Sequence, residues 1–311
     1  MRHTTILCVC LFVTAPAVAQ PTLYGIRAGG ELVRIDHIVG GGHEVAMTGI
    51  LPGTAVGRRV WLWGQIQGGG YRDHMLVPGV GGLADRLTIL DMWTVNVFST
   101  LTIDSMPAGY TIAGMGSHGE DPYVLLTADD PGAADWVGRF ALSSPRMTLI
   151  GSTGRSDMQA MTSDSSGILF AIGGDDGGAL YHIDQSTGQA LLIGGQGTFG
   201  DDTRALAIMP DGTILAAGAG LRVVDRATGV ATLIGPTGFD DIRGLAVATA
   251  CYLDCALGGA PPTLNVNDFI CFMNTFAMGL PYANCDGSNT PPVLNVSDFI
   301  CFMNKWAEGC T

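Results

Sequence analysis

Short apolar segments separated by glycine-containing turns recur along most of the chain. The letters TLIG at residues 148–151 return as LLIG at 191–194 and as TLIG at 232–235, at offsets of 43 and 41 residues. Between these copies lie Asp-Gly, Ser-Gly and Thr-Gly pairs, which favour hairpins because glycine accepts the positive φ of tight turns. Four short strands in a period of about forty residues predict the blades of a β-propeller.

The two ends of this region complete one another. Residues 244–248 match the first strand of a blade, and the strands expected at 22–26, 31–36 and 44–50 supply the other three. Sharing one blade between the ends closes a ring and leaves no exposed sheet edge. Blade ends near positions 50, 100, 150, 193 and 234 predict five blades, or six, because residues 56–126 fit the period badly.

Composition supports a mostly β protein that does not bind polyanions. The chain has 311 residues, 46 glycines, 47% hydrophobic residues and a net charge of −13. Nucleic-acid binding requires clustered Lys and Arg to displace counterions, and the chain contains no such cluster. A cation such as Ca²⁺ suits this charge better, because carboxylates are its ligands.

The first nineteen residues are predicted to be a signal peptide. Arg2 precedes an apolar run at residues 6–13, and Ala17-Val18-Ala19 provides a cleavage site before Gln20. The run is too short to span a bilayer. We therefore expect an exported protein with a propeller at residues 20–250 and a small module at 251–311.

The small module is a duplication. Residues 261–274 (PPTLNVNDFICFMN) return as residues 291–304 (PPVLNVSDFICFMN), 30 positions later. Asn265 with Asp268, and Asn295 with Asp298, predict helix caps with an acid in the first turn. Helical spacing predicts one buried face in the first copy, made of Val266, Phe269, Ile270, Met273 and Phe276.

This duplicated loop–helix unit resembles the cysteine-rich dockerin modules of exported planctomycete proteins. The resemblance covers about the last 60 residues and is carried by the repeated core LNVxDFxCFxN. It implies Ca²⁺ in the loops and a cohesin-like partner module. The ligands that it implies in the second loop are Asn284, Asp286, Ser288, Asn295 and Asp298. Those in the first loop are Asp254, Asn265 and Asp268.

The second loop is the better candidate for Ca²⁺. In the first loop Ala256 and Gly258 stand where ligand side chains are expected, so few charged oxygens remain there. The resemblance also implies that the partner contacts the helix starts, where Val266, Asn267, Val296 and Ser297 lie. The competing interpretation is a module that stabilises the chain and binds nothing.

Six cysteines lie in the module, and an even number in a small exported unit favours disulfides. Zinc is disfavoured because the module has no His and no two CxxC pairs. Six cysteines allow 15 connectivities. Repeat symmetry suggests the pairs Cys255–Cys271, Cys285–Cys301 and Cys251–Cys310.

The propeller offers little catalytic chemistry. Residues 114–119 (GMGSHG) match GxGxxG, but strands and not a helix are expected after them, so a nucleotide site is disfavoured. Asp157, Asp202 and Asp241 each precede a predicted innermost strand and would ring one mouth of the channel. There they either hold a metal or serve the fold, as turn caps or as partners of an Arg two positions later.

Two function classes follow. In the first, the propeller is a non-catalytic binding or scaffold domain that the module attaches to a cohesin-like partner. In the second, it is a secreted polysaccharide hydrolase or lyase tethered in the same way. The lack of a convincing acid–base pair in the sequence favours the first.

Overall fold

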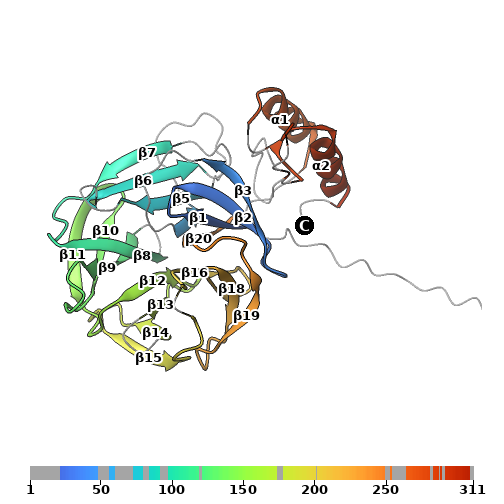
Figure 1. The fold of residues 1–311 in the computed structure, drawn as a ribbon. Coiled ribbons are helices and arrows are strands. Elements are labelled where there is room, and N and C mark those ends of the chain that lie inside the picture. Colours follow the sequence, from blue (N-terminus) through green and yellow to red (C-terminus); the bar gives the residue numbers. More distant parts are fainter. Residues whose placement is uncertain are drawn as a thin grey trace, which may run out of the picture.

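The structure is a computed structural model. It describes residues 22–47, 56–59, 73–79, 84–91, 97–118, 121–173, 178–200, 202–248, 253, 264–280, 283–286, 288 and 291–308. The predicted signal peptide lies outside these residues. Figure 1 shows a ring of β-sheets with a pair of helices beside it.

The described strands form five four-stranded blades. The first blade consists of β20 (Ile242–Ala248), β1 (Thr22–Arg27), β2 (Glu31–Ile35) and β3 (Gly42–Met47). The second consists of β4 (Val56–Arg59), β5 (Asp73–Pro78), β6 (Arg86–Asp91) and β7 (Val97–Thr102). The third consists of β8 (Tyr110–His118), β9 (Asp121–Ala128), β10 (Trp136–Ala141) and β11 (Ser144–Ser152). The fourth consists of β12 (Met158–Ser163), β13 (Leu169–Gly173), β14 (Ala179–Ile183) and β15 (Ala190–Gly194). The fifth consists of β16 (Ala205–Ile208), β17 (Ile214–Ala217), β18 (Gly220–Val224) and β19 (Ala231–Pro236).

The ring closes as the sequence predicts. β20, from the end of the propeller region, pairs antiparallel with β1, with Tyr24 opposite Ala246. The first blade is therefore shared between the two ends, and the number of blades is five. The innermost strands β4, β8, β12, β16 and β20 contact one another in turn around the ring (Figure 1). β20 and β4 also share one parallel pair, Leu245 with Val56, which joins the first two blades into one sheet.

Apolar side chains between neighbouring blades hold the ring together. Phe170, Ile172 and Leu180 of the fourth blade pack against Leu206 and Ile214 of the fifth. A second cluster joins the fifth blade to the first. Burying each such side chain contributes about 2 kcal/mol, so the packing between blades is the main source of stability.

The recurring Ile-Gly pairs have a structural cause. A Cβ on Gly151 would overlap the carbonyl oxygen of Thr187, which belongs to the outer turn of the next blade. Gly194 meets Thr228 in the same way, and Gly235 meets Val39. The outer turn of each of these blades thus presses on the backbone of the preceding blade, and only glycine leaves room for it.

The GxGxxG match is part of a strand, as the sequence argument favoured. Gly114 and Gly116 lie in β8, and a Cβ on either would meet the backbone of β12 at Met161 or Thr162. These glycines therefore permit close packing of two innermost strands.

Two helices follow the propeller, α1 (Val266–Ala277) and α2 (Val296–Glu308). Their core is aromatic, with Phe272 and Phe302 stacked at 3.9 Å between ring centroids. The predicted buried face is partly wrong: Val266, Ile270 and Met273 are exposed. The two helices pack against each other through the side that carries the phenylalanines, which turns the aliphatic stripe toward solvent.

Candidate functional site

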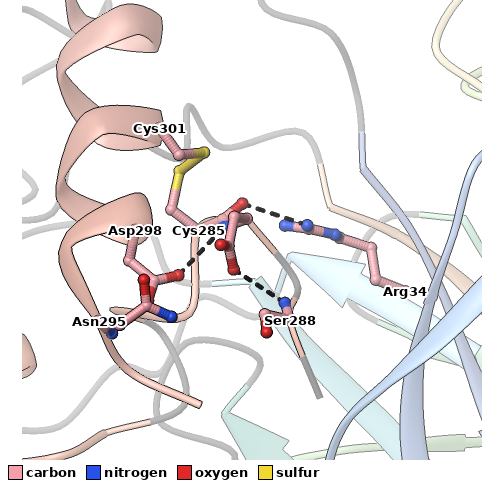
Figure 2. Close-up of a disulfide and its surroundings, with 7 residues drawn as sticks. Arg34, Cys285, Ser288, Asn295, Asp298 and Cys301 are labelled. Atoms are coloured by element: carbon pink, nitrogen blue, oxygen red, sulfur yellow. Dashed lines mark hydrogen bonds between the residues drawn. A yellow bond between two sulfur atoms is a disulfide. The ribbon is translucent and has the colours of Figure 1, made fainter. Parts of the chain in front are cut away.

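The second loop of the module brings its five predicted oxygen-bearing residues together. The Asp298 carboxylate is fully buried and accepts the backbone N–H of Asn295 at 2.9 Å and that of Asp286 at 3.2 Å. Asp286 accepts the N–H of Ser288 at 2.8 Å. The Asn284 amide donates to the Ser288 carbonyl at 3.1 Å. Figure 2 shows the Asp298, Asn295 and Ser288 side chains around this loop.

The loop places a buried carboxylate, Asp298, next to an exposed one, Asp286. Burial raises the pKa of Asp298, and the neighbouring Asp286 carboxylate raises it further; the N–H donors of Asn295 and Asp286 offset only part of this. Asn284 is 7% exposed, and its Oδ1 is buried with no hydrogen-bond partner among the described residues. A buried amide oxygen without a donor costs about 1–3 kcal/mol.

These groups fit a hard divalent cation. Ca²⁺ takes carboxylate, amide, hydroxyl and carbonyl oxygens, and it would neutralise the repulsion between Asp286 and Asp298. It would also satisfy the orphaned Oδ1 of Asn284. Asn295 and Ser288 offer further oxygens beside them. Among the described residues no group of three or more His, Cys, Asp or Glu is placed for a metal, so any cation here relies on Asn and Ser as well.

The first loop has the same cap. Asp268 is fully buried and accepts the N–H of Asn265 at 2.9 Å, while the Asn265 side chain accepts the N–H of Asn267 at 2.9 Å. This reciprocal arrangement is a capping box, which begins α1. Asp254, the third predicted ligand, lies outside the described residues.

The predicted partner-binding residues lie on the surface. Val266 is 66% exposed and Val296 is 69% exposed, and Asn267 and Ser297 beside them are also exposed. The stripe continues along both helices in matched positions: Ile270 and Met273 on α1, and Ile300 and Met303 on α2, are also exposed. The helical period alone did not identify these four residues, because aliphatic residues at that spacing usually form a core.

A disulfide joins Cys285 to Cys301, which ties the second loop to α2 (Figure 2). Cys271 is also disulfide-bonded, to a cysteine beyond the described residues. Cys251, Cys255 and Cys310 lie outside the described part of the chain. The Cys285 carbonyl also accepts a hydrogen bond from Arg34 of β2 at 3.3 Å, which links the module to the propeller.

The three aspartates that the sequence predicted at the propeller mouth have structural partners. Asp241 pairs with Arg27 at 2.8 Å, Asp202 accepts the N–H of Ala219, and Asp157 accepts the side-chain amide of Gln159. None of these three interactions is with the Arg two positions later, which one of the alternatives from the sequence expected. Each carboxylate instead fixes a neighbouring side chain or turn.

Comparisons with known proteins assign no family to this chain. No family model and no curated protein matches the chain. A chain in the crystal structure of a nidogen/laminin complex is similar to 74% of this chain over 98% of its own length, with 9% identity and a TM-score of 0.47. No described helix is long and apolar enough to cross a membrane.

Proposed function

We propose that the protein is an exported, non-catalytic β-propeller that binds or organises other molecules. Its C-terminal module would bind Ca²⁺ in the second loop and attach the chain to a cohesin-like protein module. The observation that carries this proposal is the second loop: two adjacent carboxylates and an orphaned amide oxygen lie at the base of a helix with an exposed apolar stripe.

The cation would act through the loop. Asp286, Asp298 and Asn284 would hold it, with Ser288 and Asn295 beside them. It would supply the positive charge that the loop lacks, because the described loop residues contain no Lys or Arg. The disulfide from Cys285 to Cys301 already ties the loop to the second turn of α2, so ordering the loop would also constrain that helix.

The docking face would be the exposed stripe. On α1 it comprises Val266, Ile270 and Met273, which stand at i, i+4 and i+7 on one side of the helix. The same stripe recurs on α2. An apolar helix face of this spacing suits a groove or sheet of a partner protein, and it explains why aliphatic residues face water here.

Calorimetric titration of the full chain with CaCl₂ tests the cation. We expect Asp286→Asn to weaken binding at least about tenfold, or 1.4 kcal/mol. Asp211→Asn is the matched control, because Asp211 is an exposed turn carboxylate of the propeller that accepts the N–H of Thr213. Equal binding by both variants, or no binding by the unaltered chain, would refute a cation in this loop.

Capture from envelope extracts of the source organism tests the docking. The full chain is the bait, with calcium or with chelator. We expect one cohesin-like protein to be retained with calcium and lost from the double variant Val266→Asp, Val296→Asp. Val39→Asp is the control, because Val39 is 65% exposed on the propeller. Capture that survives the double variant and fails with Val39→Asp would place docking on the propeller instead.

A further inference from the structure

Innermost strands of three blades carry a β-bulge near their starts. In β8 the extra residue is Ala113, in β12 it is Gln159 and in β20 it is Arg243, each lying where the register with the next strand shifts. A bulge leaves one residue unpaired and redirects its side chain, and bulges recur next to binding sites. These three bulges lie in the first halves of the innermost strands, toward the same end of the ring.

Polar side chains occupy this level in three consecutive blades. Gln159 stands two residues after Asp157, and Arg243 stands two residues after Asp241. The corresponding residue of the fifth blade is Arg204, two after Asp202 and directly before β16. Because β12 contacts β16 and β16 contacts β20, these side chains begin side by side at one mouth of the ring.

A hydrogen bond crosses between two of the blades. Arg204 Nη1 donates to Gln159 Oε1 at 2.7 Å. The Gln159 amide nitrogen in turn donates to Asp157. The Arg204 guanidinium is therefore held in position by the neighbouring blade, and this bond uses only one of its five N–H donors.

The Arg243 residue is half-buried, and its side chain forms no hydrogen bond or ion pair with any described residue. Asp241, two residues before Arg243, is bound to Arg27. Asp202 is bound to a backbone N–H. Neither Arg204 nor Arg243 therefore has a carboxylate partner among the described residues, because Arg204 is bound to a neutral amide and Asp241 is bound to Arg27.

We propose that Arg243, Arg204 and Gln159 form a binding site for a small carboxylate ligand at this mouth of the propeller. A guanidinium presents two parallel N–H groups that match a carboxylate, so Arg243 would be the main anchor. Arg204 would add its remaining donors from the neighbouring blade, and Gln159 would hold the Arg204 guanidinium in position. The inference rests on the proposed role of the propeller as a binding domain and names the ligand class. Free acids and acidic units of a polysaccharide share this chemistry.

Calorimetry on the full chain tests the site, with D-galacturonate, tri-galacturonate and neutral D-galactose as probes. We expect both acids to bind and galactose not to bind. Tighter binding of the trimer identifies a polysaccharide unit, and equal binding per acid identifies a free acid. Binding of galactose as tight as that of galacturonate, or no binding of either acid, would overturn the site.

Variants then locate the site. We expect Arg243→Gln to weaken galacturonate binding at least tenfold and Arg243→Lys to restore part of it, because Lys keeps the charge but not the paired donors. Arg139→Gln removes the same charge from an exposed position of β10 and should change nothing. Arg204→Gln gives an independent test if Arg243→Gln fails to fold, as judged by circular dichroism. Unchanged binding in a folded Arg243→Gln or Arg204→Gln variant would refute the site.

The acid-binding site and the docking role of the module can fail independently of each other. Loss of calcium-dependent capture with acid binding intact would refute only the module's role. Failure of acid binding with capture intact would refute only this site.

Discussion

Carboxylates in the propeller and in the module face opposite environments. In the propeller turns, Asp184 accepts the Ser186 hydroxyl and the N–H groups of Ser186 and Thr187, which lowers the pKa of Asp184 to about 2. Asp225 accepts the Thr228 N–H and hydroxyl, and its pKa is also lowered. In the module, burial raises the pKa of Asp298. Asp184 and Asp225 are therefore stabilised by donors within their turns, while Asp298 has no positively charged partner among the described residues.

The two regions also differ in what holds them together. The propeller is stabilised by apolar clusters between blades and by close backbone contacts at glycine. The module has a core of a few aromatic residues, with Phe272 and Phe302 at its centre. A unit this small has a marginal core, so its disulfides carry a larger share of its stability.

Removing a disulfide should affect the module most. The bond from Cys285 to Cys301 spans 16 residues, so replacing both cysteines with Ser should cost about 3 kcal/mol of module stability. Hydrogen exchange should show faster opening of α2 amides and unchanged protection of β13 in the propeller. Equal protection of α2 in the variant would mean that packing alone holds the module.

Adding a side chain where two blades touch should lower the stability of the propeller only. Gly195 has φ +81° and a Cβ there would overlap the Gly229 carbonyl, so Gly195→Ala should cost about 2–4 kcal/mol. Gly197 has φ +72° and nothing near its Cβ position. Gly197→Ala should therefore cost only about 1–2 kcal/mol of stability. Thermal unfolding compares the two variants. Equal losses would show that the outer turns do not press on the preceding blade.

Lowering the pH should change the stability of the two regions in opposite directions. The lowered pKa of Asp184 means that its contribution is complete above the ordinary value of 3.8 and is lost as the pH falls toward about 2. The raised pKa of Asp298 means that the calcium-free module is most stable below 3.8 and loses that contribution as the pH rises.

Hydrogen exchange read separately over β14 and α2, after correction for intrinsic rates, measures these slopes. Calcium should abolish the module's loss of stability at neutral pH. Asp298→Asn should flatten the dependence of the module's stability on pH. Parallel slopes in the two regions would contradict the contrast between their carboxylates.

The smallest effect is expected at an ion pair between blades. Arg226 of the fifth blade pairs with Asp164 of the fourth and lies over the Phe170 ring at 4.7 Å. Burial raises the pKa of Asp164, but Arg226 and the N–H groups of Ile168 and Ser166 together more than offset this, so the pKa is lowered. Arg226→Gln should cost about 0.5–1 kcal/mol, because Arg226 is largely solvated. Arg139→Gln should leave the melting temperature unchanged, and an equal shift in both variants would show that the pair contributes nothing.

The sequence by itself determined the repeat, the shared blade and the duplicated helices. Each of these rests on local rules: positive φ at Asp-Gly and Thr-Gly turns, the period of apolar residues, and Asn–Asp caps at the helix starts. The sequence could not show why glycine follows Ile in these pairs, because Thr187 and Gly151 meet only when two blades pack. The turn at Asp36 belongs to the same set as those at Asp184 and Asp225, but Val39 replaces the Thr that marks them.

Tertiary structure alone decided which polar residues have partners. Asp241 pairs with Arg27, 214 positions away, and not with the Arg beside it, because ring closure brings the two ends together. The exposed aliphatic stripe of α1 and the orphaned Oδ1 of Asn284 likewise depend on how two helices and a loop pack. Local sequence dictates hydrogen bonds within a turn, but burial and charge balance depend on contacts between residues far apart in the chain.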